Sequence, residues 1–356
     1  MKPKAIPLVK AAFKKQFENA MLKNGLSPDY YFKEVNLPTH AQEDPESLLP
    51  EKPFWHLANL VSVDGEIPDY GAQTAQLTPW HKVESMMPLI CSRANLEDLL
   101  HTFCKIAPGQ SSSVRFALEQ DESELWFSYI GKPLIKNDIQ MELYRVTCMI
   151  QLVQLAAGSG WYPKQIELLM PEKKVVSASR LISKSRITFS QARSGFSIPN
   201  LLLKLPINIE IPYIKTSRNQ YDINADFVLT ILQLISIFIS NKNCNLDDIA
   251  RITELPKRTL QRRLKSHGTC FNDLLNQAKF NLAKDKLENS CATITEISFQ
   301  LGYSGPSHFN HAFHRWRVCH PVSSGLNKKP DAGRGTHITC PNSKNRNCKR
   351  PELSAI

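Results

Sequence analysis

The chain has 356 residues, a hydrophobic fraction of 42%, a charged fraction of 22% and a formal net charge of +11. These values are typical of a soluble globular protein with two domains, each long enough to bury a core. No segment approaches the roughly 18 consecutive apolar residues of a membrane span, since the longest apolar-rich run, 227–239, is interrupted by polar side chains. The N-terminus also lacks a secretory apolar stretch, so we expect a cytoplasmic protein without a membrane partner.

The excess positive charge lies in the last third of the chain. Residues 241–325 hold 12 Lys and Arg against 7 Asp and Glu, and residues 326–356 hold 7 against 2. The rest of the chain holds 25 against 24 and is therefore close to neutral. A basic region beside a near-neutral one predicts a polyanionic partner at one end of the molecule.

The cysteines do not form a recognisable metal or disulfide pattern. There are nine, and none belongs to a C-x-x-C pair. Their odd number and irregular spacing predict reduced thiols, as in cytosolic proteins. His337, Cys340 and Cys348 are imaginable metal ligands, but their irregular spacing in a polar tail argues against a site. We therefore expect neither a metal ion nor a cofactor.

Residues 1–215 are predicted to form an α+β domain for effector binding or dimerisation. Helical periodicity predicts a helix at 9–24 that ends at Gly25. Alternating apolar residues at 113–118 and 125–130 predict a β-hairpin. The other predicted helices cover 54–61, 96–106 and 139–157, and the other predicted strands cover 165–169, 186–189 and 201–205.

A polar linker at 216–223 is predicted to separate this domain from an all-α domain at 224–325. A helix at 227–240 would open the second domain and cover its core. From residue 326 on, Lys, Asn, Gly, Pro and Ser dominate, which predicts a basic, disordered tail at 326–356.

The second domain carries one helical pattern twice. In the first copy, a short amphipathic helix starts at Leu246 and a second helix covers 257–265; in the second copy, the helices start at Ile294 and Pro306. Two short helices joined by a tight turn form a helix-turn-helix, whose second helix can enter the DNA major groove. Helical spacing over 271–287 predicts a helix that connects the two copies.

Capping patterns mark the start of each copy. Thr293 is followed by Glu296, which is a capping-box spacing, and Asn245 with Asp248 is a looser version of it. These pairs predict that a helix begins directly after residue 293 and another directly after residue 245.

The second helix of the first copy has one apolar and one basic face. Leu260 and Leu264 are four residues apart and are predicted to face the core. On the opposite face, Arg can pair with guanine and Gln with adenine, while Lys can neutralise phosphates. A solvated basic face without a partner is the alternative. The predicted DNA-contacting residues are Lys257, Arg258, Gln261, Arg262 and Lys265.

The second helix of the second copy is less charged. Phe309 and Phe313, with Ala312 and Trp316, are predicted to face the core. The other face can hydrogen-bond base edges or contact phosphates; alternatively, this copy only supports the first and contacts the DNA backbone. A metal site formed by His308 with the other histidines of this helix is a further alternative. The predicted DNA-contacting residues are Ser307, Asn310, His311 and His314.

Four motifs of this domain form a multi-part signature: 258–264 (RTLQRRL), 268–271 (GTCF), 297–303 (ISFQLGY) and 309–316 (FNHAFHRW), followed by Pro321. Together they resemble the DNA-binding domain of AraC/XylS-type transcription regulators. The resemblance implies two helix-turn-helix units joined by a long helix, with recognition helices in major grooves about one helical turn apart. It also implies that Arg258, Gln261 and Arg262, and the equivalent face with Ser307, Asn310 and His311, lie where the family contacts bases.

The first half is also similar to this family, through 142–145 (ELYR) and 156–163 (AAGSGWYP). These segments resemble the arabinose-binding-type effector domain that some of its members carry. The resemblance implies an effector domain but does not identify a ligand.

Three departures from the family pattern affect the second domain. Thr253 and Glu254 stand where the family has Leu-Gly, Pro256 replaces a capping Ser, and Val318 replaces a Gly. A Glu where positive φ is favoured costs about 1 kcal/mol, so we expect the first turn to be slightly strained. None of these changes removes a predicted base-contacting residue.

The first functional hypothesis is a sequence-specific, effector-responsive transcription regulator that acts as an activator. Its expected partners are double-stranded promoter DNA, RNA polymerase, a small-molecule effector and a second protomer. A repair alkyltransferase-type enzyme with a similar targeting domain is an alternative; it needs an activated Cys, and neither Cys91 nor Cys148 has a neighbouring base in the sequence. A non-specific architectural DNA binder is a third possibility, with affinity independent of sequence. We predict no catalytic residue.

Overall fold

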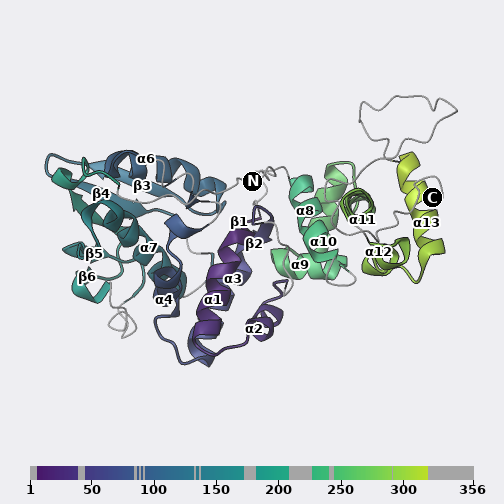
Figure 1. Ribbon diagram of the computed structural model, residues 1–356, viewed down its shortest axis with the longest axis horizontal. Coiled ribbons are helices and arrows are strands. Elements are labelled where there is room, and N and C mark those ends of the chain that lie inside the picture. The colour runs from purple at the N-terminus through teal and green to yellow at the C-terminus, as the bar shows by residue number, and fades with distance from the viewer. Residues whose placement is uncertain are drawn as a thin grey trace, which may run out of the picture. The chain divides into compact units, whose positions relative to one another are not determined.

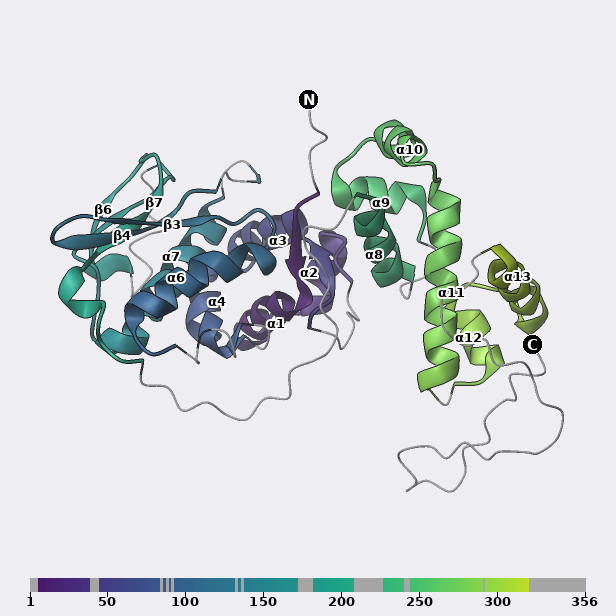
Figure 2. The ribbon, with the colours of Figure 1, turned by 90° about the horizontal axis from the view of Figure 1, so that it is seen from above.

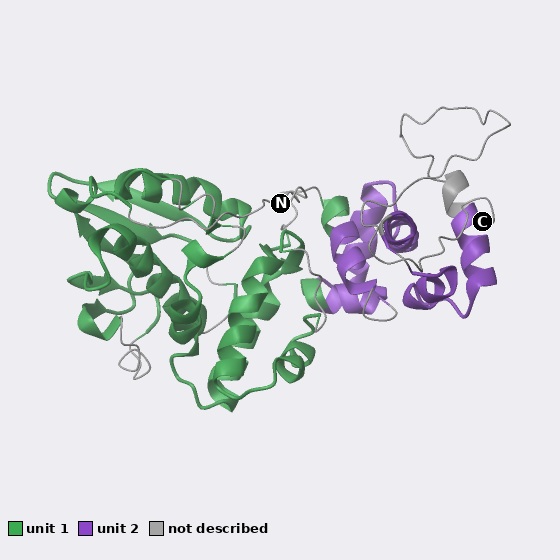
Figure 3. Cartoon of the chain, viewed as in Figure 1, with its two compact units in different colours: residues 1–230, 252–254 green, residues 231–251, 255–356 purple. Residues whose placement is uncertain are grey.

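The computed structural model describes residues 6–38, 45–83, 86–87, 90, 93–131, 134–135, 138–171, 182–207, 227–239, 244–290 and 292–319. The chain divides into two compact units (Figure 3). Unit 1 comprises residues 1–230 and 252–254, and unit 2 comprises residues 231–251 and 255–356. The predicted linker at 216–223 and the predicted tail at 326–356 lie outside the described residues.

Unit 1 contains a five-stranded sheet with the strand order β3-β4-β7-β5-β6. The predicted hairpin forms its first two strands, and the Asp121 carboxylate closes the turn by accepting from the backbone N–H of Ser123 and of Glu124, each at 2.8 Å. All neighbours are antiparallel except β5 and β6. The strands are β3 (Phe116–Gln120), β4 (Glu124–Tyr129), β5 (Gln165–Glu167), β6 (Arg186–Thr188) and β7 (Ser194–Pro199).

Helices cover one side of this sheet (Figures 1 and 2). The central one, α7, packs against α3, α4, α6 and β7, and most of its side chains are buried. Its contact with α4 is close, because a Cβ on Gly71 would lie 1.8 Å from the carbonyl oxygen of Gln140. The helices are α1 (Lys14–Lys23), α2 (Pro28–Glu34), α3 (Glu51–Asp64), α4 (Tyr70–Leu77), α6 (Leu96–Ile106) and α7 (Ile139–Ala157), with 3-10 turns η1 (Ala11–Phe13), η2 (Trp80–Lys82), η3 (Ala107–Gly109), η5 (Ile182–Lys184) and η6 (Asn200–Leu202).

The sequence predictions for unit 1 are partly confirmed. The helices at 96–106 and 139–157 have the predicted bounds, and the helix predicted at 54–61 is α3. The helix predicted at 9–24 is confirmed as α1 (Lys14–Lys23), but its predicted start is wrong, because Leu8–Lys10 is strand β1 and pairs with Leu48–Pro50, strand β2. A pairing across so many intervening residues leaves no signal in local periodicity.

The strand predicted at 201–205 is also wrong. That segment begins with η6, and the strand that completes the sheet is β7, directly before it. Gly195 and Pro199 weaken the strand signal of β7. The glycine is required there, since a Cβ at residue 195 would lie 2.4 Å from the carbonyl oxygen of Phe127 on β4. Helices α2 and α4 were not predicted.

Unit 2 is helical throughout its described residues. Its connecting helix α11 runs along the unit and contacts both α12 and α13 (Figure 2). Helix α8 begins at the last residues of unit 1 and continues into unit 2. None of the described helices has the length and apolar character that a bilayer span needs. The helices are α8 (Phe227–Ile239), α9 (Leu246–Thr253), α10 (Lys257–Ser266), α11 (Phe271–Asn289), α12 (Ile294–Gln300) and α13 (Pro306–Cys319).

Candidate nucleic-acid interface and a buried cavity

The first helix-turn-helix is formed by α9 and α10. A reciprocal cap starts α9: the backbone N–H of Asp248 donates to Asn245 Oδ1 at 3.0 Å, and the backbone N–H of Asn245 donates to Asp248 Oδ2 at 3.1 Å. The helix ends in a turn at Glu254, whose φ is 52°. This is the left-handed conformation that is unfavourable for a Glu, so the strain at this turn stays a testable prediction. Pro256 precedes α10 and provides no side-chain cap, as predicted.

Helix α10 has the two faces that the sequence predicts. Leu260 and Leu264 are 0% and 1% exposed, so they anchor the helix on the core of unit 2. One of the exposed residues, Lys257, forms an ion pair with Asp247 on α9, which holds the start of α10 against the preceding helix. The structure brings all five predicted side chains to the exposed surface of this helix: Lys257, Arg258, Gln261, Arg262 and Lys265.

The second helix-turn-helix is formed by α12 and α13. The predicted capping box is present, because Thr293 N donates to Glu296 Oε2 at 2.7 Å and Glu296 N donates to Thr293 Oγ1 at 3.2 Å. The turn after α12 contains Gly302, with a φ of 80°. Gly302 therefore occupies the position in the second helix-turn-helix that Glu254 occupies in the first helix-turn-helix.

An aromatic cluster anchors α13. Phe309 is completely buried, and its ring centroid lies 5.9 Å from that of Tyr303 and 5.6 Å from that of Phe313. Phe280 of the connecting helix α11 lies 5.2 Å from Phe313, and the Lys279 ammonium lies 4.7 Å from the centre of the Tyr303 ring. This cluster ties the second recognition helix to α11.

The predicted residues of α13 are not all equally accessible. Ser307, His311 and His314 are exposed, but Asn310 is half-buried and its Oδ1 is buried without a hydrogen-bond partner among the described residues. Position 310 directly follows the buried Phe309, so it lies at the edge of the packed face rather than opposite it. Asn310 is therefore less exposed than a residue opposite the core, while its contact with DNA stays a prediction.

Two other expectations concern residues at or beyond the end of α13. The position of the Trp316 side chain and the imagined ligand set His337, Cys340 and Cys348 lie outside the described side chains. Within the described residues, no group of three or more His, Cys, Asp or Glu side chains could hold a metal ion.

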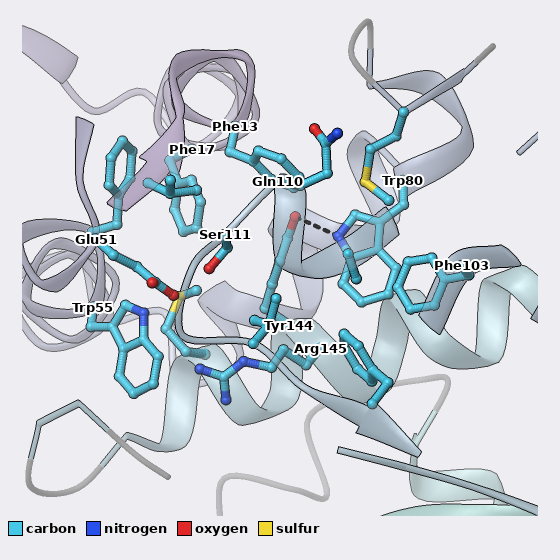
Figure 4. A pocket seen from close by; sticks show the side chains of 17 residues that line it. Phe13, Phe17, Glu51, Trp55, Trp80, Phe103, Gln110, Ser111, Tyr144 and Arg145 are labelled. Carbon is cyan, nitrogen blue, oxygen red and sulfur yellow. Dashed lines mark hydrogen bonds between the residues drawn. The ribbon is translucent and has the colours of Figure 1, made fainter. Parts of the chain in front are cut away.

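Unit 1 contains a buried cavity of about 60 Å³ (Figure 4). Its wall is rich in aromatic side chains and includes residues of α1, α3, η2, α6, β3 and α7. The space is about four to six times the roughly 10–15 Å³ that one water molecule requires. The aromatic lining residues are Phe13, Phe17, Phe54, Trp55, Trp80, Phe103, Phe116 and Tyr144.

Most polar groups at this cavity are already paired. Trp80 Nε1 donates to Tyr144 Oη at 2.9 Å, and Tyr144 Oη donates to Gln16 Oε1 at 2.7 Å. The Arg145 guanidinium lies between the rings of Trp55 and Tyr129, at 4.4 and 4.3 Å from their centres. The two hydrogen bonds satisfy Trp80 Nε1, Tyr144 Oη and Gln16 Oε1 within the protein.

Arg145 belongs to a cluster of buried charges on and near α7. Its Nη1 and Nη2 atoms both lie 3.2 Å from Asp138 Oδ2. Burial raises the pKa of Asp138 to about 7, against the lowering by Arg145. Burial also raises the pKa of Glu142, although its carboxylate accepts from Ser194 Oγ and from the backbone N–H groups of Leu169 and Met170.

Glu51 is the remaining carboxyl group of this cluster and it lines the cavity. Ser113 Oγ donates to Glu51 Oε1 at 2.6 Å, while Glu51 Oε2 has no partner among the described residues. Burial raises the pKa of Glu51, and the hydrogen bond from Ser113 offsets this only in part. This cluster of buried charges beside the cavity was not predicted from the sequence. The available signal was a pair of charged residues, Glu142 and Arg145, inside the otherwise apolar segment 139–157.

Two protein-family models match the chain. The model described as the N-terminal arabinose-binding domain of AraC transcription regulators matches residues 25–207, and a helix-turn-helix domain model matches residues 249–323. Together they cover most of the described parts of both units.

Several curated relatives align with the chain. An HTH-type transcriptional regulator of Mycobacterium bovis is 44% identical over 69 residues, which are 19% of this chain and 20% of that protein. The HTH-type transcriptional regulator VirS of Mycobacterium tuberculosis is 20% identical over 312 residues, 84% of this chain and 91% of VirS. The HTH-type transcriptional activator RhaS of Shigella boydii is 36% identical over 72 residues, 20% of this chain and 26% of RhaS.

The match with the M. bovis protein thus spans about one fifth of that relative. The crystal structure of the transcriptional regulator CdpR from Pseudomonas aeruginosa aligns with 86% of this chain and 95% of its own, at 16% identity and a TM-score of 0.39. This low TM-score supports no conclusion about fold or function. None of these matches names an alkyltransferase, which was the enzyme alternative.

Proposed function

Because the chain belongs to the family of AraC transcription regulators, we propose that it binds promoter DNA sequence-specifically through two recognition helices, α10 and α13. The observation that carries this proposal is the exposed face of α10. Its cationic and amide side chains are held outward by two buried leucines. An inserted α-helix of this kind can present several side chains to base edges at once.

Each side chain of α10 has a proposed task. Arg258 and Arg262 can each form a bidentate pair with guanine N7 and O6, and Gln261 can pair with adenine N6 and N7. Lys257 and Lys265 lie near the two ends of the helix, where they can neutralise phosphates without reading sequence. Lys257 already pairs with Asp247, so we expect it to contribute less than Lys265.

Helix α13 is proposed to contact DNA through side chains that carry no permanent charge. Ser307, His311 and His314 are exposed and can donate or accept hydrogen bonds at base edges or phosphates. Asn310 has its amide oxygen turned inward, so only its amide nitrogen is proposed to contribute. A supporting role, in which α13 contacts only the DNA backbone, is the alternative for this helix.

Unit 1 is proposed to bind a small-molecule effector or a second protomer and so to control DNA binding. We further propose that the protein activates transcription next to RNA polymerase. Two observations support this: the N-terminal family model covers residues 25–207, and RhaS, a relative in the DNA-binding region, is named an activator. The proposed domain bounds remain 1–215 and 224–325, with the linker at 216–223 and the tail at 326–356.

The test is selection of bound duplexes from a randomised pool by the full chain, followed by affinity measurements on the selected site. Arg262→Ala should lose about 1–3 kcal/mol of binding free energy and relax the preference at one base pair. Arg251→Ala is the matched control, because it removes an exposed arginine from α9 rather than from the reading helix. It should weaken binding at most uniformly across sequences.

The same experiment separates the proposal from a non-specific architectural binder. Enrichment of no sequence, with affinity that depends only on salt, would support the architectural function instead. Unchanged affinity and preference in Arg262→Ala would show that α10 is not the reader.

A further inference from the structure

The cavity of unit 1 contains polar atoms that the described part of the chain does not satisfy. They are Glu51 Oε2, Trp55 Nε1 and Ser111 Oγ. Glu51 is 4% exposed and Trp55 is completely buried, so solvent does not compensate for the missing partners. Leaving a buried polar atom unpaired is unfavourable, and three such atoms around one cavity indicate that a further molecule completes the site.

These atoms lie on neighbouring parts of the wall. Figure 4 shows the Glu51 carboxyl, the Trp55 indole nitrogen and the Ser111 hydroxyl directed toward one another at one end of the cavity. Ser111 Oγ lies near enough to Glu51 to lower the pKa of its carboxyl group as a hydrogen-bonding neighbour, although the two side chains do not meet the geometry of a formed hydrogen bond. The other end of the cavity is walled by aromatic rings, such as Trp80 and Phe103, whose centroids lie 4.8 Å apart.

The three atoms differ in the hydrogen-bond partner that each requires. Trp55 Nε1 can only donate a hydrogen bond, an ionised Glu51 carboxylate can only accept, and Ser111 can do either. A ligand group that only donates would leave Trp55 unpaired, and one that only accepts would leave an ionised Glu51 unpaired. A single hydroxyl group satisfies both, because it donates to Glu51 and accepts from Trp55.

We propose that this cavity binds a small, neutral and mostly apolar molecule that carries one hydroxyl group, and that this molecule is the effector. The inference rests on the proposed effector function of unit 1 and specifies the chemistry of its ligand. The aromatic wall takes the hydrocarbon part, and Glu51, Trp55 and Ser111 take the hydroxyl.

The charges around the cavity favour a neutral ligand. Arg145 is already paired with Asp138, so it is not available to an incoming carboxylate. An anion would also lie beside Glu51, with Asp138 and Glu142 nearby. A cation gains from Glu51 but loses its hydration in an aromatic site that already contains the Arg145 guanidinium.

The lining also argues against a sugar, although the N-terminal family model is described as arabinose-binding. A sugar would bury several hydroxyl groups against aromatic rings, and each unpaired hydroxyl would be costly. Only one end of this cavity offers free polar atoms. L-arabinose is therefore the negative probe for the proposal.

The experiment measures binding of four-carbon probes to the full chain. The set comprises n-butanol, n-butylammonium, butanoate and butanone, which differ in charge and in hydrogen-bonding capacity but little in size. Isothermal titration calorimetry gives the dissociation constants, and tryptophan fluorescence reports occupancy because Trp55 and Trp80 line the cavity. We expect n-butanol to bind about tenfold more tightly than the other three, as one additional buried hydrogen bond would give. L-arabinose should not bind.

Two variants locate the preference in the cavity. Glu51→Leu removes the acceptor while retaining a side chain of similar size, and Trp55→Phe removes the donor while retaining a ring. Each should reduce the preference for n-butanol over butanone, with Glu51→Leu abolishing it. The matched controls are Asp64→Leu, at the exposed end of the same helix, and Trp126→Phe, which does not line the cavity. Both controls should keep the preference.

Several results would overturn the proposal. They are equal or tighter binding of butylammonium, butanoate or L-arabinose, no binding of any probe, and a full preference for n-butanol in a folded Glu51→Leu variant. The probe series on the unmodified protein decides the question even where a variant does not fold. A parallel DNA selection separates the two proposals, because failure to enrich a DNA sequence contradicts the proposed function while leaving the alcohol preference intact.

Discussion

The two helix-turn-helix units of unit 2 share a backbone arrangement but not a surface chemistry. Both begin with a reciprocal cap, at Asn245 and at Thr293, and both turn at a residue with positive φ. Yet α10 exposes lysine and arginine, whereas the described exposed side chains of α13 include serine and histidine. The arrangement depends on a few buried and capping residues, so the exposed face can change without altering the fold.

The interiors of the two helix-turn-helix modules also differ. Aliphatic Leu260 and Leu264 anchor α10, while Phe309 and Phe313 anchor α13 through tilted ring contacts with each other and with Phe280 of α11. Aromatic side chains bury more area and have defined pair geometry. We infer that the second helix-turn-helix depends more on the packing of its core, and the first helix-turn-helix more on its charged surface.

The largest expected effect tests this difference in packing. Phe309→Ala should lower the free energy of unfolding by about 3–5 kcal/mol, and Leu264→Ala by about 2–5 kcal/mol, because both leave cavities in a core. Denaturant unfolding of the full chain measures both changes. His308→Ala, an exposed neighbour on the same helix, is the control and should change stability by less than about 0.5 kcal/mol. A Phe309→Ala variant as stable as this control would contradict the inferred role of the aromatic cluster.

The second prediction concerns the turns. Glu254 has a φ of 52° and Gly302 a φ of 80°, and this region is favourable only for glycine. Glu254→Gly should therefore be more stable than Glu254→Ala by about 1 kcal/mol. Both variants lose the carboxylate, so the difference isolates the backbone. Gly302→Ala should lower the free energy of unfolding by a similar amount, through the turn of the second helix-turn-helix. Equal melting temperatures for the two Glu254 variants would mean that the first turn is not strained.

The third prediction separates the two recognition helices by their response to salt. Lys265→Ala should reduce the slope of log K against log salt by about 0.9, since it removes one phosphate-neutralising charge. Ser307→Ala removes no charge and should leave the slope unchanged. Fluorescence anisotropy on the selected duplex at several salt concentrations measures both slopes. Equal changes in the two variants would mean that the helices do not divide electrostatic and hydrogen-bonding contacts in this way.

The smallest effect concerns the cap of α12. The backbone N–H of Thr293 donates to the Glu296 carboxylate and holds the pKa of this group below its ordinary value of 4.5. Because the folded pKa is lowered, this contribution to stability is complete above the unfolded pKa and is lost as the pH falls through the folded one. An NMR titration of the Glu296 side chain should show the low pKa, and Thr293→Ala should raise it part of the way back. A pKa at or above 4.5 in the unmodified protein would contradict the cap.

Sequence reasoning predicted unit 2 better than unit 1. Its signals are local: the Thr293–Glu296 spacing, the four-residue spacing of Leu260 and Leu264, and Gly302 at the turn. Such patterns act within one or two helical turns, so they can be read directly. The partial burial of Asn310 was missed, because the edge of a packed face depends on how neighbouring helices lie against it.

In unit 1 the helices α6 and α7 and the β3–β4 hairpin were predictable, but the long-range strand pairings were not. The strand pair at Leu8–Lys10 and Leu48–Pro50, and strand β7, depend on partners far away in the sequence. The cavity likewise collects Glu51, Ser111 and Arg145 from separate elements. No local pattern specifies such a meeting of side chains.

The amino-acid sequence by itself determined the two helix-turn-helix units, their caps, the turn at Glu254 and the basic face of α10. The caps and the basic face follow from side chains a few residues apart on one helix, while the turn at Glu254 was expected from the resemblance to the family. Only the tertiary structure decided that Asn310 is half-buried, that β7 completes the sheet and that Glu51 and Trp55 have polar atoms without partners beside a cavity. These properties arise from packing between distant segments, where burial and hydrogen bonding depend on the whole fold.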